Sequence, residues 1–223
     1  MPDQVTEGAG EYLEAIFKLN GAVQPVAIPA LAARLGVSVA SANEMVRRLA
    51  ERGLVSYEPY RGVQLTEHGR GEAMRVVRRH RLWERFLTDF LGIPWDQVHE
   101  EACRLEHVTS ALVEERLARF LAAPESCPHG HHIPTAEGEL PADKGVPLVE
   151  LGAGREGEVV SVPEEEPALL RYLGELALKP GQRLRVEDIG PFGGPIRIRV
   201  CGRVHSLGRE LSRQIMVRPV GGG

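Results

Sequence analysis

Four side chains that can bind a metal ion lie within nine residues of the chain, at His99, Cys103, Glu106 and His107. Their offsets of zero, four, seven and eight place them on one face of a helix, because residues three or four apart lie above one another. A thiol, a carboxylate and two imidazoles would be costly to bury without partners. Together they offer the nitrogen, oxygen and sulfur donors that first-row divalent metals accept. The spacing therefore indicates a metal site on this helix.

Two further segments carry potential ligands one helical turn apart. His80 and Glu84 form one pair, and Glu11 and Glu14 form the other. Each pair alone is typical of a solvated helix surface, so the interpretation depends on their combination with the first group. Three helices that each supply ligands favour a metal-binding protein.

The elements that would position these residues begin with three short helices. Apolar residues recur at helical spacing over residues 11–19 and again over residues 28–35, where Gly36 ends the second helix. Ser38 has the type and position of an N-cap for a third helix over residues 39–52. Two helices joined by a short glycine-containing turn form a helix-turn-helix, a DNA-binding arrangement.

Two short strands are predicted at residues 54–57 and 62–65, where they would form the wing of a winged helix-turn-helix. The third helix carries small and polar side chains suited to base edges, since asparagine can pair with adenine and glutamate can accept from cytosine. We expect base contacts from Ser38, Ala40, Ser41, Asn43 and Glu44. Phosphate contacts are expected from Arg47 and Arg48 of the helix and from Tyr60 and Arg61 of the wing.

A long helix is predicted over residues 66–91, followed by helices over 95–108 and 109–122. Their apolar residues exceed what three lone helices can bury, so a partner surface is expected and a homodimer is the natural inference. From residue 123 to 154 the composition shifts to Pro, Gly, His and acidic residues, which is typical of a linker.

The last part of the chain holds short β-type runs separated by turns. They lie at residues 157–162, 183–186, 196–200 and 215–217, with one helix over 167–176. A small barrel of about 65 residues would account for this pattern.

Bulk composition excludes several classes of protein. The 223 residues contain no apolar run of the roughly 18 residues that a membrane helix needs, and the N-terminus lacks a signal-peptide pattern. We therefore expect a cytoplasmic protein without a membrane partner. Three widely spaced cysteines do not resemble a disulfide framework. Residues 34–85 hold 11 Arg and 6 Glu, and this positive balance suits binding to phosphates. Residues 96–166 hold 5 basic and 16 acidic residues, and this negative balance suits binding to cations.

The chain resembles the diphtheria-toxin-repressor family of iron- and manganese-dependent regulators in the run Arg79-His80-Arg81-Leu82-x-Glu84-Arg85-Phe86-Leu87 followed by Gly92-Ile93-Pro94-Trp95-x-x-Val98-His99-x-Glu101-Ala102-Cys103-x-x-Glu106-His107. The resemblance spans nearly the whole chain. It implies a mainly α fold with some β structure. The expected parts are a winged helix-turn-helix domain over 1–65, a helical dimerisation and metal domain over 66–140, a linker over 141–154 and an SH3-like domain over 155–223.

Carried over residue by residue, the resemblance implies two metal sites. The family's primary site falls on Glu11, Cys103, Glu106 and His107, and its ancillary site falls on His80, Glu84 and His99. In the manganese-type arrangement Glu14 and His80 can join the primary site. The resemblance therefore identifies the ligand residues but does not fix which of the two sites each one belongs to.

The metal preference implied by the resemblance is mixed. Iron-responsive members have Met where this chain has Glu11, while manganese-responsive members have acidic residues at Glu11 and Glu14 and a Glu in place of Cys103. Carboxylates favour hard Mn²⁺ and a thiolate favours softer ions such as Fe²⁺ or Zn²⁺. We favour Mn²⁺, with Fe²⁺ next.

Two other segments contain potential metal ligands. The resemblance aligns an acidic stretch with residues 164–166, and we expect Glu166 to donate to the ancillary site, although Leu169 replaces the glutamine expected three residues later. The loop Cys127-Pro128-His129-Gly130-His131-His132 offers four ligands as a zinc loop would, yet Pro128 and Gly130 fit a turn and similar family loops are connectors. A connector is therefore favoured, and Cys201 is expected in the core.

The combined prediction is a homodimeric, metal-dependent transcriptional regulator of metal homeostasis that reads an inverted repeat in double-stranded DNA. Metal would join the first helix to the dimerisation helices and set the spacing of the recognition helices. A metallohydrolase or a metal-storage protein could use the same ligands, but neither would explain the winged helix.

Overall fold

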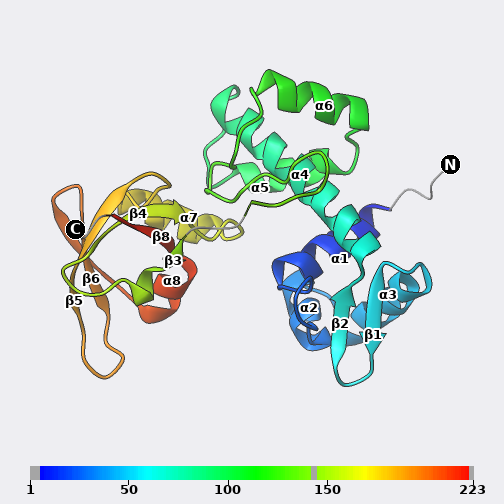
Figure 1. Cartoon of the computed structure of the whole chain (residues 1–223), viewed down its shortest axis with the longest axis horizontal. Helices are drawn as coiled ribbons and strands as arrows, with labels where there is room; N and C mark the ends of the chain where they lie inside the picture. Colours follow the sequence, from blue (N-terminus) through cyan, green and yellow to red (C-terminus); the bar gives the residue numbers. More distant parts are fainter. Residues whose placement is uncertain (1–5, 142–144, 221–223) are drawn as a thin grey trace. The chain divides into compact units, whose positions relative to one another are not determined.

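The computed structural model describes residues 6–141 and 145–220 (Figure 1). By its internal contacts the chain divides into two compact units. Unit 1 comprises residues up to His80 together with residues 106–109 and 134–139. Unit 2 comprises residues 81–105, 110–133 and 140 onwards. Within the described ranges, no helix combines the length and the apolar character needed to cross a membrane.

Unit 1 contains the predicted winged helix-turn-helix. Its elements are α1 (Glu7–Lys18), α2 (Ile28–Leu35), α3 (Val39–Glu51), β1 (Val55–Glu58), β2 (Gly62–Leu65) and the first half of α4 (Glu67–Asp89). The Ser38 hydroxyl accepts a hydrogen bond from the backbone N–H of Ser41 at 3.0 Å and so caps α3 as expected. Leu13, Ile16 and Leu31 are completely buried in the core that these elements share.

The wing is joined to α4 by a tightly packed corner. Strands β1 and β2 pair antiparallel, with Val55 opposite Leu65. The Thr66 hydroxyl donates to the carbonyl of Gly53 at 2.7 Å and accepts from the N–H of Gly69 at 3.0 Å, so it caps α4. A side chain at Gly69 would lie 1.8 Å from the Leu54 carbonyl oxygen, which explains why glycine follows the threonine at this spacing.

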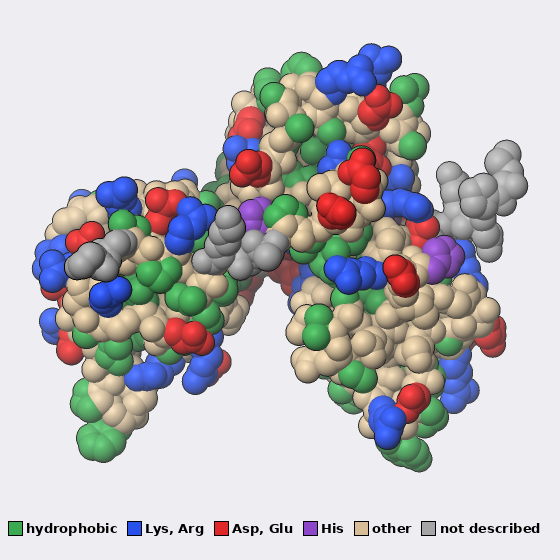
Figure 2. All heavy atoms as spheres, in the orientation of Figure 1, with side chains coloured by type: hydrophobic (Ala, Val, Ile, Leu, Met, Phe, Trp, Pro, Cys, Tyr) green, Lys and Arg blue, Asp and Glu red, His purple; other side chains and the backbone are tan. Residues whose placement is uncertain are grey.

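The helical part of unit 2 is formed by the second half of α4 with α5 (Val98–Glu106) and α6 (Ala111–Phe120). Leu82, Leu87 and Val98 are buried between these helices. Phe86, Phe90 and Phe120 form a chain of ring contacts, with centroids 4.8 Å apart between Phe90 and Phe120. Figure 2 shows hydrophobic side chains at the surface around α6, as expected of a surface that a partner covers.

The C-terminal part is a six-stranded antiparallel sheet, which confirms the expected SH3-like domain. Its strand order is β3-β8-β4-β5-β6-β7. The strands are β3 (Val146–Pro147), β4 (Glu156–Ser161), β5 (Arg183–Ile189), β6 (Ile196–Val200), β7 (Arg203–Leu207) and β8 (Met216–Val220). A short 3₁₀ turn, η1 (Leu148–Glu150), and the helices α7 (Pro167–Glu175) and α8 (Arg209–Gln214) complete it.

Several residues of the segment expected as a linker, 141–154, contribute to the C-terminal sheet and its core. Strand β3 begins at Val146, and Leu148 and Leu151 are buried in the core of the C-terminal sheet. These residues are apolar but irregularly spaced, so periodicity alone does not distinguish them from a connector. Residues 146–151 therefore belong to the C-terminal sheet and its core.

Candidate functional site

Helix α1 brings two carboxylates to one side of unit 1. Its apolar residues Leu13 and Ile16 are buried in the core, and this fixes the direction in which Glu11 and Glu14 point. Glu14 is 8 % exposed, whereas Glu11 is exposed. Helix α1 approaches the end of α5 closely at Gly10, where a side chain would meet the His107 ring at 3.4 Å.

Glu14, His80 and Glu106 form a buried group of ligands. Ligand atoms of the three residues lie within 4.8 Å of one another, and His80 and Glu106 are 1 % and 2 % exposed. His80 Nδ1 and Glu106 Oε2 share a hydrogen bond of 2.6 Å. Burial raises the pKa of Glu106, although the hydrogen bond from His80 opposes this shift. A divalent cation would compensate two buried carboxylates and accept the imidazole as a third donor, so these residues fit a metal ion.

A second group extends this site toward the surface. Glu7, Glu11 and His107 place ligand atoms within 4.8 Å of one another, with both glutamates exposed. His107 Nε2 lies 3.1 Å from Glu106 Oε1, so the two oxygens of Glu106 face one imidazole each. We call these six residues the α1 site: Glu7, Glu11, Glu14, His80, Glu106 and His107. All of them except Glu7 were predicted as metal ligands from the sequence. Glu7 precedes Glu11 by one helical turn, and this spacing could have identified it as a further candidate ligand.

Unit 2 holds a separate buried group of potential ligands that was not predicted from the sequence. Glu84, Cys127, His129 and Glu164 are all buried, and each places a ligand atom within 4.8 Å of the others. His129 Nδ1 lies 3.4 Å from Glu84 Oε1 and 3.9 Å from Cys127 Sγ. We call this group the loop site, because two of its members come from the loop over residues 127–132.

The backbone around residue 130 explains why the loop side chains are buried. The N–H of Cys127 donates to the His131 carbonyl at 2.9 Å, which closes the loop, and the N–H of Val162 donates to the His129 carbonyl at 3.1 Å. Gly130 has φ +90°, and a side chain there would lie 1.9 Å from the Val160 carbonyl oxygen. The connector interpretation correctly identified a turn, but the turn packs against the end of β4 and carries Cys127 and His129 inward.

The electrostatics of the loop site favour occupation by a cation. Burial, and then the negative charge of Glu84, raise the pKa of the Cys127 thiol well above its ordinary value. For His129, burial lowers the pKa, but the hydrogen bond and charge of Glu84 outweigh it and the net shift is upward. The donor set of two carboxylates, one imidazole and one thiol suits a transition metal.

Other predicted ligands fall around these two sites. His99 Nδ1 lies 3.6 Å from Glu84 Oε1 at the loop site, and His99 Nε2 lies 3.7 Å from Cys103 Sγ one turn along α5. Glu166 is exposed and stands at the N-cap of α7, and the structure brings Glu164 to the loop site in its place. Cys201, expected in the core, is exposed in the turn between β6 and β7.

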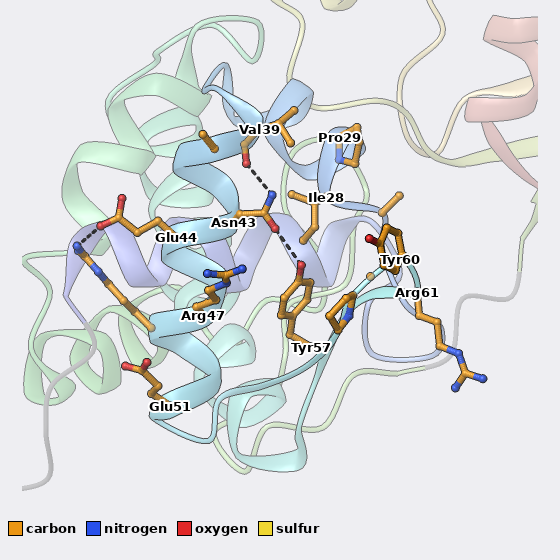
Figure 3. A pocket seen from close by; sticks show the side chains of 15 residues that line it. Ile28, Pro29, Val39, Asn43, Glu44, Arg47, Glu51, Tyr57, Tyr60 and Arg61 are labelled. Carbon is orange, nitrogen blue, oxygen red and sulfur yellow. Dashed lines mark hydrogen bonds and ion pairs between the residues drawn. The ribbon is translucent and has the colours of Figure 1, made fainter.

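All the predicted DNA-contacting residues except Ser38 and Ser41 line a groove of about 810 Å³ between α3 and the wing (Figure 3). Asn43 is held at both ends, because its Nδ2 donates to the Val39 carbonyl at 3.1 Å and its Oδ1 accepts from the Tyr57 hydroxyl at 3.0 Å. Glu44 pairs with Arg48 on the same helix. Two of the predicted base-reading side chains are therefore engaged within the protein.

The other residues predicted to contact DNA lie at the start of α3, along α3 and on the wing. Ala40 and Arg47 line the groove from α3, and Figure 3 shows Arg47 between the helix and the wing. Tyr60 is fully exposed on the wing, and Arg61 pairs with Glu58 at 2.9 Å. Ser38 and Ser41 share a hydrogen bond of 2.8 Å at the start of α3.

Three segments match described protein families. Residues 4–63 match the iron dependent repressor N-terminal DNA binding domain, and residues 66–135 match the iron dependent repressor metal binding and dimerisation domain. Residues 146–219 match the FeoA domain.

Relatives of known function match the chain over nearly its whole length. The iron-dependent repressor IdeR of Mycobacterium tuberculosis is 35 % identical over 222 residues, which cover 94 % of this chain and 96 % of the relative. Among solved structures, a manganese-dependent transcriptional repressor in complex with manganese has a TM-score of 0.88 and 36 % identity, covering 95 % of this chain and 99 % of that one. The repressor ScaR with bound Zn²⁺ has a TM-score of 0.83 and 30 % identity, covering 95 % and 99 %.

These matches support neither a metallohydrolase nor a metal-storage protein, because the related proteins are repressors. The winged helix, the dimerisation helices and the SH3-like domain follow one another in the order of the matched family segments. The chain belongs to the iron-dependent repressor family, whose members include the diphtheria toxin repressor, and is a metal-dependent, DNA-binding transcriptional repressor rather than an enzyme.

Proposed function

We propose that this repressor is switched on by Mn²⁺ bound at the α1 site, with Fe²⁺ as the next candidate, and that it controls metal homeostasis. One observation carries the proposal: Glu106 faces both His80 and His107, while α1 supplies Glu14 beside the first imidazole and Glu11 beside the second. A bound metal would therefore tie α1, which belongs to the DNA-binding core, to the end of α5.

The donor set supports manganese at this site. All six residues of the α1 site offer carboxylate oxygen or imidazole nitrogen, and hard oxygen donors suit Mn²⁺ better than softer ions. The loop site includes a thiol and suits Fe²⁺ or Zn²⁺ better. The related structure with manganese and the relative named as iron-dependent are both compatible with this division.

When bound, the metal supplies a divalent positive charge that compensates the buried carboxylates. Glu14 and Glu106 hold the buried part of the site, and Glu11 and His107 hold its outer part. Because α1 packs into the same core as α2 and α3, restraining α1 restrains the recognition helix. Linkage requires that DNA tighten metal binding by the same factor by which metal tightens DNA binding.

A homodimer would present two recognition helices to an inverted repeat. Exposed apolar side chains just after α4 and on α6 support such an interface, among them Phe90, Leu112, Val113 and Phe120. Two-fold symmetry in a protein is mirrored by a palindromic operator with half-sites about one or more helical turns apart.

The test is DNA binding measured by fluorescence anisotropy under anaerobic conditions. Selected inverted repeats would be titrated with protein at increasing Mn²⁺ or Fe²⁺ concentrations. We expect Mn²⁺ to tighten binding at lower free concentration than Fe²⁺. Preference for Fe²⁺ would reassign the activating metal, and DNA binding that ignores both metals would refute the proposed mechanism.

A further inference from the structure

A lysine stands directly beside the α1 site. Lys18 Nζ lies 3.1 Å from Glu14 Oε1, one turn along α1, and both side chains are only 11 % exposed. Other pairs of this spacing lie in solvent, as Arg119 and Glu115 on α6 do with exposures of 66 % and 62 %. An exposed pair contributes little to stability, whereas an enclosed pair is screened much less by water and salt.

The same carboxylate faces two kinds of partner. Glu14 places an oxygen within 4.8 Å of ligand atoms of His80 and Glu106, and it also pairs with the Lys18 ammonium. The chain therefore carries a cation of its own at the edge of a group that accepts a metal cation. Without metal, this ammonium compensates the charge of the buried Glu14 carboxylate, while the neighbouring Glu106 contacts His80 and His107.

We infer that Lys18 is an internal counter-ion that competes with the metal for Glu14 and thereby raises the metal concentration at which the repressor binds DNA. The inference rests on the proposed function of the α1 site. Its physical basis is repulsion, because a unit charge a few ångströms from a divalent ion in a poorly solvated site disfavours metal binding. The same charge stabilises the metal-free fold, so one residue acts in opposite directions on the two states.

The experiment compares Lys18→Gln and Lys18→Arg with the wild-type full-length chain. Mn²⁺ binding is measured by isothermal titration calorimetry, and the binding event weakened by Glu14→Gln is assigned to the α1 site. Thermal midpoints of the metal-free proteins are measured in parallel by circular dichroism. Arg213→Gln, which removes a cation paired with Glu210 on α8, serves as the matched control.

We expect Lys18→Gln to bind Mn²⁺ about tenfold or more tightly and to lower the free Mn²⁺ concentration needed for DNA binding by a similar factor. Its metal-free thermal midpoint should fall, because Glu14 then lacks its ammonium partner. Lys18→Arg keeps the charge and should remain near wild type in both measurements. In a Glu14→Gln background the substitution should change Mn²⁺ affinity much less, since the competition acts through Glu14.

Unchanged or weaker Mn²⁺ binding by Lys18→Gln would overturn the inference, because Lys18 would then have no effect on the site or would orient Glu14 as a ligand. If Lys18→Gln does not melt cooperatively, Lys18→Met provides the same test with a side chain that packs better. Failure of the proposed function has a different outcome: wild-type protein would bind DNA equally well with and without metal.

Discussion

His80 Nδ1 and Glu106 Oε2 share a 2.6 Å hydrogen bond between two side chains that are almost completely buried. The pair joins α4 to α5, and Glu14 from α1 lies beside it. Burial raises the pKa of Glu106, so the carboxylate is held in a state that a cation would stabilise. This relationship makes Glu106 the residue on which metal binding at the α1 site most depends.

Glu106→Gln should weaken Mn²⁺ binding by roughly a hundredfold, because the amide keeps the shape and the contact with His80 but removes the charge. DNA binding should then lose its response to Mn²⁺ at concentrations that saturate the wild type. Calorimetry and fluorescence anisotropy measure the two effects. Glu100→Gln is the matched control, because Glu100 is exposed on the same helix.

The raised pKa of Glu106 also predicts how pH acts on the metal-free protein. A carboxyl whose pKa is raised on folding contributes stability below its ordinary value near 4.5, and this contribution is lost as the pH rises through the folded-state pKa. The glutamine of Glu106→Gln does not titrate, so the variant does not lose this contribution. As the pH rises above about 4.5, the metal-free thermal midpoint of the variant should therefore increase relative to that of the wild type. Parallel melting profiles across this range would contradict the assignment.

Protons should also compete with the metal at this residue. Mn²⁺ needs the ionised carboxylate, so the raised pKa makes Mn²⁺ affinity begin to fall at a higher pH than an ordinary glutamate would cause. Titrations of Mn²⁺ at several pH values measure this dependence. Affinity that stays constant until the pH reaches the ordinary glutamate range would contradict either the raised pKa of Glu106 or its role as a ligand.

Much of the α1 site and of the fold could be predicted from local sequence. The helices around Leu13 and Leu31 follow from apolar periodicity, and the spacing of Cys103, Glu106 and His107 follows from one helical face. Strand β7 and helix α8 were not predicted. β7 is an edge strand with mostly polar exposed residues, and α8 has only six residues.

The loop site could not be assembled in the same way. Cys127 and His129 are close in sequence, but their burial depends on backbone contacts with Val160 and Val162, which are about 30 residues away. The choice between Glu164 and Glu166 depends on how the chain turns after β4, and no periodicity specifies that turn. The local pattern correctly predicted a turn, but only the tertiary contacts show that this turn buries the Cys127 and His129 side chains.

Cys127→Ser should weaken metal binding at the loop site while leaving the Mn²⁺ response of the α1 site largely intact. The pKa of the Cys127 thiol is raised well above its ordinary value, so a metal bound there must displace a proton. Metal affinity at this site should therefore increase by about tenfold or more for each unit rise in pH near neutrality, because the raised pKa of His129 allows a second proton to be displaced. Zn²⁺ titrations in buffers of different ionisation enthalpy count the protons released.

The control for this prediction is Cys201→Ser, because Cys201 is exposed in a turn of the C-terminal sheet. Its metal binding and proton release should match those of the wild type. Equal losses in both variants would contradict the loop site, and so would Zn²⁺ binding by wild type without proton release.

Tyr57→Phe should weaken DNA binding about as much as Asn43→Ala, because the hydrogen bond between these residues joins the wing to α3. If Asn43 acts by positioning the wing, the double variant should lose little more than either single variant. Additive losses would show instead that Asn43 contacts bases directly. Anisotropy with operator and mismatched duplexes distinguishes the two roles.

Arg47 lines the same groove and should behave differently from Asn43. Arg47→Ala should weaken binding to specific and non-specific DNA by similar factors, and it should reduce the salt dependence by about one unit of slope. Arg213→Ala, on α8 of the C-terminal domain, is the control. A loss confined to one operator sequence would make Arg47 a base-reading residue.

Phe120→Glu should dissociate the homodimer, because it places a charge in the apolar surface formed by Phe86, Phe90 and Phe120. Light scattering after size-exclusion chromatography would show a shift toward monomer at micromolar concentrations. Binding to an inverted repeat should fall by at least tenfold, whereas each monomer should still bind Mn²⁺ at the α1 site, because none of its ligands lies on α6. Phe192→Glu is the control, since Phe192 is fully exposed in the turn between β5 and β6 of the C-terminal sheet. A Phe120→Glu protein that remains dimeric would place the dimer interface elsewhere on the molecule.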